Sequence, residues 1–208
     1  MASDEHQPDA AGAPLRPGYP SQAGATSMEA MRSQWIAFYD AEWALVIRFV
    51  MKAGPASLED ARDAAQEAFV ESWSEMVTRP DEWSRVNQRG WIRTVALRRF
   101  RRPPGPRRRP LIEPGVAMPD LPAPSVEPGE HTVQIHTVLD ALSRLEPVER
   151  EVMAFLTDGF RLVDIPGLVD LTEQKTRDIA RSARMKLKRH LATAATPEGG
   201  AQDERRRR

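Results

Sequence analysis

The segments DARDAAQEAFVESW (residues 60–73) and RGWIRTVA (residues 89–96) contain the strongest pattern in this chain. The first segment has apolar residues on one side of a predicted helix and carboxylates on the other, and the second opens an arginine-rich stretch. Apolar residues that recur at about 100° per residue predict an amphipathic helix. The sequence therefore predicts an acidic helix followed by a basic one.

The acidic helix has one stripe of carboxylates, formed by Asp60, Asp63, Glu67 and Glu71. Like charges three or four residues apart destabilise an isolated helix unless a partner uses them. The stripe has three interpretations, which are a solvated surface, a metal site and a docking face for another protein. No histidine or other ligand motif accompanies the carboxylates, which counts against a metal. Ser57 is expected to cap this helix at its N-terminus.

Arginines and aromatic residues alternate between Trp83 and Arg102. From Arg79 to Arg109 the chain has eleven arginines and two acids, although the whole chain has no net charge. Guanidinium groups neutralise phosphates and aromatic rings stack on exposed bases, a combination typical of single-strand binding. Trp91 fits core packing as well as base stacking. The residues expected to contact a melted DNA strand are Arg89, Trp91, Arg93, Arg98, Arg99, Arg101 and Arg102.

The last predicted helix has an apolar back and a basic front. It follows a short apolar segment and a turn at Asp170, and Thr172 is placed to cap it. This order is typical of a helix-turn-helix unit, whose second helix enters the major groove. Exposure of the basic front to solvent without DNA binding is the alternative. The residues expected to read or clamp DNA are Gln174, Arg177, Arg181 and Arg184.

Composition narrows the classes of function. The 208 residues include no cysteine, which excludes disulfides and thiolate chemistry and fits a reducing cytoplasm. No signal peptide and no run of about 20 apolar residues is present, so we expect no membrane insertion. No phosphate loop, nucleophile–base pair or metal-ligand cluster is recognisable, so we expect no enzyme activity, no cofactor and no small-molecule substrate.

Proline distribution predicts the domain organisation, because nine of the 18 prolines lie between Pro103 and Pro128. We expect an all-α protein of two small helical domains joined by this linker, the second a helix-turn-helix domain. Gly159 is expected to end a helix in the left-handed conformation. The expected boundaries are a disordered tail at 1–27, a helical domain at 28–102, a Pro/Arg-rich linker at 103–129, a helix-turn-helix domain at 130–191 and a disordered tail at 192–208.

Two sets of motifs resemble those of bacterial sigma factors of the extracytoplasmic-function type. The pattern Asp-x-x-Gln-Glu-x-Phe stands at residues 63–69. Residues 158–160, 164–165 and 183–184 resemble the helix-turn-helix domain that ends those proteins, and the two resemblances occur in the family's order. In the family, the acidic helix docks on a coiled-coil projection of the largest polymerase subunit. The resemblance implies that core RNA polymerase is bound by Asp60, Asp63, Gln66 and Glu67.

The resemblance also implies that the chain directs core RNA polymerase to specific promoters and helps to open the DNA. Promoter DNA and core polymerase are the implied partners, with an inhibitory anti-sigma protein as a further candidate. The chain departs from the family at Asp170, which replaces the turn glycine. It also departs at Pro166, which is expected inside the supporting helix at the loss of a backbone hydrogen bond. Two alternatives remain: a DNA-binding regulator that does not recruit polymerase, and a helical protein-interaction module that does not bind DNA.

Overall fold

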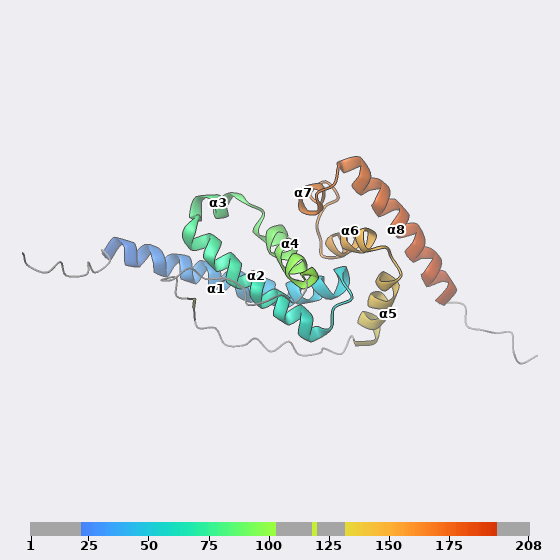
Figure 1. The fold of residues 1–208 in the computed structure, drawn as a ribbon, viewed down its shortest axis with the longest axis horizontal. Coiled ribbons are helices and arrows are strands. Elements are labelled where there is room, and N and C mark those ends of the chain that lie inside the picture. Colours follow the sequence, from blue (N-terminus) through green and yellow to red (C-terminus); the bar gives the residue numbers. More distant parts are fainter. Residues whose placement is uncertain (1–21, 103–117, 120–131, 195–208) are drawn as a thin grey trace, which may run out of the picture.

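The computed structural model is helical throughout its folded part, and it describes residues 22–102, 118–119 and 132–194. Within these ranges the chain forms eight helices and no strand, which confirms the all-α expectation (Figure 1). Residues 22–102 are referred to below as the first half and residues 132–194 as the second half. The helices are α1 (Gln22–Ala53), α2 (Leu58–Thr78), α3 (Pro80–Arg85), α4 (Gln88–Arg101), α5 (Thr132–Ser143), α6 (Pro147–Thr157), α7 (Pro166–Val169) and α8 (Glu173–Ala194).

The expected tails and linker are described only in part. The expected tail at 1–27 overlaps the start of α1, so its last residues are helical. The rest of that tail, most of the linker at 103–129 and most of the tail at 192–208 lie outside the described residues. In the linker, Met118 is described and packs against the main hydrophobic cluster.

Side-chain caps set the starts of α2 and α4. Ser57 Oγ accepts a hydrogen bond from the Asp60 backbone N–H at 3.1 Å, and the Ser57 N–H donates to Asp60 Oδ2 at 3.2 Å. This reciprocal pair is a capping box and confirms the cap expected at Ser57. At the start of α4, Asn87 Oδ1 accepts from the Gly90 N–H at 3.1 Å. The cap at Asn87 divides the expected basic stretch into α3 and α4.

The turns of the second half use two left-handed residues, Gly159 with φ of 87° and Asp170 with φ of 53°. The left-handed conformation was expected for Gly159 and a turn was expected at Asp170, and glycine and aspartate tolerate this conformation better than most residues do. Thr172 Oγ1 accepts from the Lys175 N–H at 3.3 Å and caps α8, as expected. The expectation for Pro166 was wrong: it is the first residue of α7, where its missing N–H is not needed by the helix.

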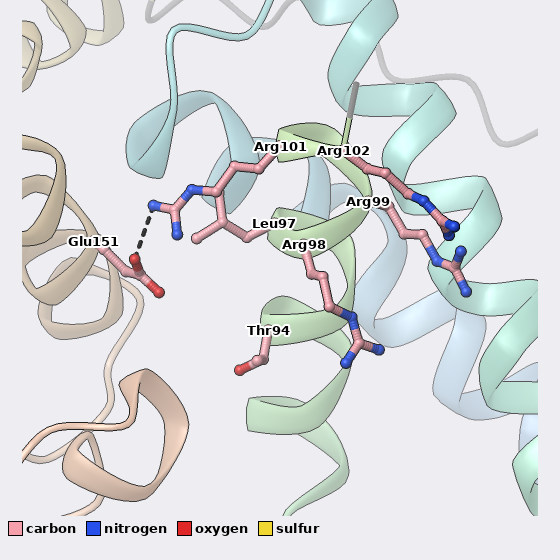
Figure 2. Close-up of a pocket in the computed structure, with 7 residues that line it drawn as sticks. All are labelled: Thr94, Leu97, Arg98, Arg99, Arg101, Arg102 and Glu151. Carbon is pink, nitrogen blue, oxygen red and sulfur yellow. Dashed lines mark ion pairs between the residues drawn. The ribbon is translucent and has the colours of Figure 1, made fainter. Parts of the chain in front are cut away.

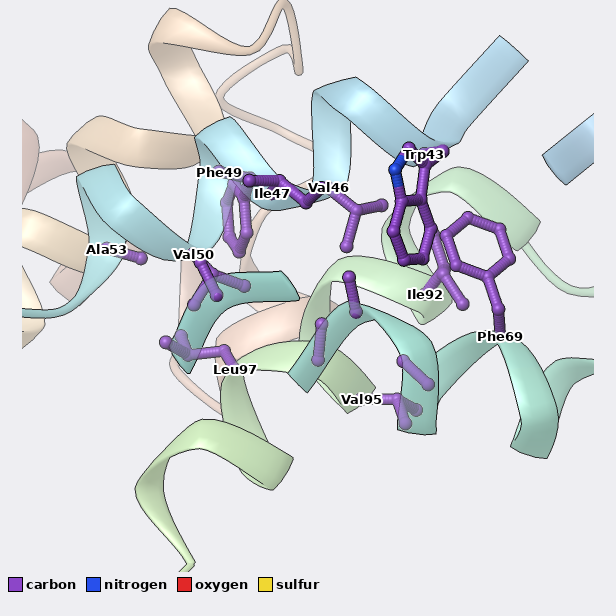
Figure 3. Packing of buried hydrophobic residues seen from close by; sticks show 14 of the residues in the cluster. Trp43, Val46, Ile47, Phe49, Val50, Ala53, Phe69, Ile92, Val95 and Leu97 are labelled. Atoms are coloured by element: carbon purple, nitrogen blue, oxygen red, sulfur yellow. The ribbon is translucent and has the colours of Figure 1, made fainter. Parts of the chain in front are cut away.

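The main hydrophobic cluster is centred on aromatic rings of α1 and α2 (Figure 3). The ring of Phe69 lies 4.9 Å from that of Tyr39 and 5.7 Å from that of Trp43, measured between centroids. Apolar residues of α4, including Ile92 and Val95, close the cluster from the other side. Because full burial of a large apolar side chain contributes about 1.5–3 kcal/mol, this packing holds α1, α2 and α4 together.

The same cluster continues into the second half. The ring centroid of Phe155 in α6 lies 4.6 Å from that of Phe49 in α1, and both side chains are fully buried. Ile165 and Ala180 are buried in this cluster as well. The expected division into two domains is therefore not visible in the packing of the core. A smaller cluster joins α5, α6 and α8 through Leu142, Leu145, Met153 and Ala183.

Candidate nucleic-acid and protein interfaces

The carboxylate stripe of α2 is exposed at its N-terminal end. The side chains of Asp60, Asp63 and Gln66 lie on the surface of the molecule. Asp60 is also part of the capping box with Ser57, so the side chains of Asp63 and Gln66 are the ones that the cap does not use. A protein partner can reach this end of α2. The residues buried on the opposite side of the helix are Ala61, Ala64, Ala65, Ala68, Phe69, Ser72, Trp73 and Met76.

The C-terminal end of the same stripe faces α4. Glu71 accepts hydrogen bonds from Arg98 Nη2 and from Arg99 Nε, each at 3.0 Å. Glu67 is half-buried, and its Oε2 lies 4.0 Å from Arg99 Nε. Of the residues expected to bind core polymerase, Glu67 is therefore turned toward α4, whereas the other three face solvent. The acidic and basic stripes, expected to serve different partners, neutralise each other here.

Arg93 is a fully buried charge at the junction of three elements. Its Nη1 donates to Glu42 Oε2 at 2.8 Å and to the Arg89 carbonyl oxygen at 2.8 Å, and its Nε donates to Asp158 Oδ2. Arg89 Nε lies 2.9 Å from the other Glu42 oxygen. Glu42 belongs to α1 and Asp158 ends α6, so one guanidinium joins both halves. In this arrangement Arg93 exposes no surface to a DNA strand.

Asp158 is shared between Arg93 and Lys52, whose Nζ lies 3.7 Å from Asp158 Oδ1. Burial lowers the pKa of the Lys52 ammonium, and the Asp158 carboxylate offsets part of that shift. The guanidinium carbon of Arg93 lies 5.3 Å from the centre of the Phe160 ring, within the range of a cation–π contact. The residues of this group, referred to below as the Arg93 cluster, are Glu42, Lys52, Arg89, Arg93 and Asp158.

Sequence reasoning did not identify Glu42, Lys52 or Asp158 as partners of Arg93. The sequence does indicate that Glu42 is buried, because it lies between Tyr39 and Val46 in the apolar pattern of α1. An acid on a buried helix face needs a cation, since an unpaired buried charge is costly. The pattern does not show which of the 30 basic residues supplies that cation.

The C-terminal half of α4 lines a groove of about 560 Å³ beside α6 (Figure 2). Arg101 reaches across it, with Nη2 2.8 Å from Glu151 Oε2. Arg98 and Arg102 point away from α6 and are exposed. Most of the solvent-accessible cations expected to hold a DNA strand therefore lie at the C-terminal end of α4, and Arg89 is exposed at its start. The residues that line the groove are Thr94, Leu97, Arg98, Arg99, Arg101, Arg102 and Glu151.

Trp91 takes part in the packing of α3 against α4. Its half-buried ring meets that of Trp83 edge-on, with 5.2 Å between centroids and an interplanar angle of 88°. Trp83 in turn contacts the ring of Phe38, at 5.9 Å. These contacts favour core packing of Trp91 over stacking on a base.

The polar front of α8 faces solvent along the helix. Arg177 Nη2 donates to Glu173 Oε2 at 2.7 Å and its Nη1 donates to Gln174 Oε1 at 3.1 Å, so its guanidinium is positioned by neighbours on the same helix. Ala180 and Ala183 on the opposite side are fully buried. The structure thus brings together the four residues expected on this front, and all are exposed: Gln174, Arg177, Arg181 and Arg184.

Among the described residues, no helix is long and apolar enough to cross a membrane. In the same part of the chain, no three side chains of His, Asp or Glu are placed to hold a metal ion together. No protein-family model matches this sequence, and no curated protein matches it. The functional interpretation therefore depends on the residues and their geometry.

Proposed function

We propose that this chain is a sigma-factor-like subunit that binds core RNA polymerase, directs it to promoters and helps to open the DNA. The observation that carries the proposal is the presence of three separate polar surfaces in one small helical molecule. They are the exposed acidic end of α2, the exposed arginines at the end of α4 and the polar front of α8. Separated charge of this kind suits a protein with one protein partner and one nucleic-acid partner.

The acidic end of α2 is the proposed docking face for core polymerase. Asp63 and Gln66 are exposed side by side on consecutive turns, and Asp60 extends the same stripe. Complementary charge orients association, and like charges brought together across an interface cost several kcal/mol. Glu67 lies behind this face, on the side of α2 that is turned toward α4, and contacts Arg99.

The C-terminal end of α4 is the proposed site for the melted promoter strand. Arg98 and Arg102 are exposed, and Arg101 lies at the edge of the groove beside α6. Each phosphate contact on a single strand contributes about 0.7 to the slope of log K against log salt concentration. Replacing all three arginines with alanine should therefore reduce that slope by about 2 and weaken opening of the promoter.

The second half supplies the proposed contact with the upstream promoter element. In this proposal α7 and α8, joined by the left-handed turn at Asp170, form a helix-turn-helix unit. Gln174 and Arg177 lie near the N-terminal end of α8, where a recognition helix reads base edges in the major groove. Arg181 and Arg184 follow on the same front and are suited to phosphates.

Co-purification with bacterial core polymerase, followed by run-off transcription, tests the proposal. Asp63→Lys reverses the charge of the docking face and should abolish co-purification and transcription without loss of helical content. Asp40→Lys, an exposed acid on α1, makes the same change elsewhere and should have no effect. If the parent chain fails to bind core polymerase, or if Asp63→Lys binds as well as the parent, the proposal is wrong.

A second candidate function is that of a helical protein-interaction module that does not bind DNA. It is favoured by the carboxylates that occupy the guanidinium groups of Arg93 and Arg99. Such a module would bind core polymerase, or another protein, without any affinity for promoter DNA. A DNA-binding regulator that does not recruit polymerase would not co-purify with it, so co-purification separates these two alternatives.

A further inference from the structure

The second half covers one face of α4. Besides the Arg93 cluster, Glu151 Oε2 in α6 lies 2.8 Å from Arg101 Nη2 (Figure 2). Thr94 Oγ1 donates to the carbonyl oxygen of Leu168 in α7 at 3.3 Å. Thr94 and Arg101 are seven residues apart in the sequence, which places them on one side of a helix. The contacts therefore follow a single face of α4.

The acids of the second half that contact this face of α4 present the same chemistry as a nucleic-acid backbone. Carboxylate and phosphate oxygens both accept charge-assisted hydrogen bonds from guanidinium groups. Two of the arginines expected to contact a DNA strand, Arg93 and Arg101, are bonded to Asp158 and Glu151 of the second half. Each of these carboxylates uses donors that a strand phosphate would need.

We propose that the second half of this chain and a single nucleic-acid strand compete for the same face of α4, with Asp158 and Glu151 in the positions of strand phosphates. The inference rests on the proposed function of α4. The described arrangement is then a closed form in which Arg89, Arg98 and Arg102 remain accessible. Binding of a strand by Arg101 and by the Arg93 donor that Asp158 occupies requires the second half to move away from α4.

Apolar contacts stabilise the closed form together with the ion pairs. Phe49 and Phe155 are fully buried with 4.6 Å between their ring centroids, and opening exposes both. A buried ion pair resists the loss of either partner, because the remaining charge stays uncompensated. The open form is therefore a minor species in the free chain. The affinity for a strand is the intrinsic affinity multiplied by the open fraction, so the free chain binds weakly.

A disulfide can lock the closed form, because the chain has no cysteine of its own. A Cβ added at Gly90 of α4 would lie 2.7 Å from Leu168 Cδ2 in α7. Because the Leu168 side chain is the nearest group to a Cβ at this position, we expect cysteines at both positions to be close enough to be joined. In the double variant Gly90→Cys, Leu168→Cys, mild oxidation should form the bond within one molecule, and a reducing agent should release it. One preparation then provides a locked form and an unlocked form.

Removal of the two acids should open the molecule. The variant Glu151→Gln, Asp158→Asn removes the second half's counter-charges to Arg101 and Arg93 and leaves the sequence of α4 unchanged. The variant Asp140→Asn, Asp164→Asn is the matched control: it also removes two carboxylates from the second half, but those acids pair with Arg144 and Arg161 of the same half. Helical content, measured by circular dichroism, shows whether each variant is folded.

The measurement is the affinity for a fluorescent single-stranded DNA oligonucleotide. The opening variant should bind about tenfold more tightly than the parent and the control, since affinity rises with the population of the open form. In the opening variant that also carries the cysteine pair, the disulfide should form more slowly. Once formed, it should remove the gain in affinity, and reduction should restore it.

Three other results would overturn the inference, and they are distinguishable. Equal affinity of the oxidised and reduced forms of the opening variant would exclude competition and leave the proposed function intact. Failure of the cysteine pair to form a disulfide in the otherwise unchanged chain would exclude the closed arrangement. Absence of DNA binding by every form, with slow disulfide formation showing that the variant is open, would refute the proposed role of α4 and the inference with it.

Discussion

Glu71 of α2 holds Arg99 of α4, with 3.0 Å between Arg99 Nε and Glu71 Oε2 and a second bond from Arg99 Nη2 to the same oxygen. The two side chains are only 12% and 20% exposed. A pair shielded from water in this way is more sensitive to loss of one partner than a surface pair is. It fixes the basic helix against the acidic one, at the end of α2 away from the proposed docking face.

Glu71→Ala should lower the free energy of unfolding by about 1–3 kcal/mol, because Arg99 would remain poorly solvated without its acceptor. Glu71→Gln retains a neutral acceptor and should lower the free energy of unfolding by less. Glu29→Ala, an exposed change on α1, should stay within about 0.5 kcal/mol of the parent. Urea unfolding measures all three variants. A loss for Glu71→Ala no larger than that for Glu29→Ala would contradict the structural role of the pair.

Arg93→Met should destabilise the fold by about 3–5 kcal/mol, since Glu42 and Asp158 would be left as buried charges with less compensation. Arg93→Lys should also be less stable than the parent, because one ammonium group cannot span both carboxylates. Adding Glu42→Gln and Asp158→Asn to Arg93→Met should recover part of the loss. Arg102→Ala is the exposed control. Equal urea midpoints for the Arg93→Met and Arg102→Ala variants would refute this role of Arg93.

Glu149 of α6 joins that helix to α8 by accepting from Ser182 Oγ and from Lys186 Nζ, each at 2.8 Å. Burial raises the pKa of the Glu149 carboxyl, but the bonds from Lys186, Ser182 and the Glu146 backbone outweigh it and leave the pKa below its ordinary value of 4.5. A carboxyl whose pKa is lowered by folding stabilises the folded state above its unfolded pKa. That stabilisation is lost as the pH falls through the folded pKa.

Glu149→Gln should therefore be less stable than the parent at pH 7 and should lose less stability on acidification below the unfolded pKa of 4.5. The difference between the two proteins isolates Glu149 from the other carboxyls, which titrate in both. Urea midpoints at a series of pH values give this difference. Parallel pH profiles for the two proteins would show that the contacts of Glu149 with α8 do not stabilise the fold.

Arg177→Ala and Arg184→Ala should differ in their effects on DNA binding. Arg177 is positioned by Glu173 and Gln174 near the start of α8, so its loss should relax the preference at one or two base pairs, worth about 1–3 kcal/mol. Arg184 lies later on the exposed front, and its loss should weaken binding to all sequences alike. Selection from a randomised upstream element, followed by sequencing, measures both effects. Identical selected sequences and affinities in the parent and both variants would show that this front only faces solvent.

The local features of the fold were predictable from the sequence. Ser57, Gly159 and Asp170 adopt the cap and turn conformations that their residue types favour. From Ala61 to Met76 the apolar side of α2 is buried where the helical spacing placed it, whereas Leu58 in the first turn is exposed. The cap and turn conformations depend on contacts between residues no more than about four positions apart, so a short window of sequence contains all the partners. The prediction for Pro166 was wrong because a proline costs a backbone hydrogen bond inside a helix but not at its first residue. The sequence did not show that α7 begins at Pro166.

The roles of individual arginines in α4 depended on long-range packing. Arg93 and Arg102 belong to one basic stretch, yet Arg93 is fully buried and Arg102 is exposed. The carboxylates that bind Arg93 are 51 and 65 residues away in the chain, in α1 and at the end of α6. Helical periodicity assigns a residue to a face, but the charge that meets that face is set by how the helices pack. The buried ion pairs between the halves therefore arise only when α1, α4 and α6 are brought together by the shared apolar core.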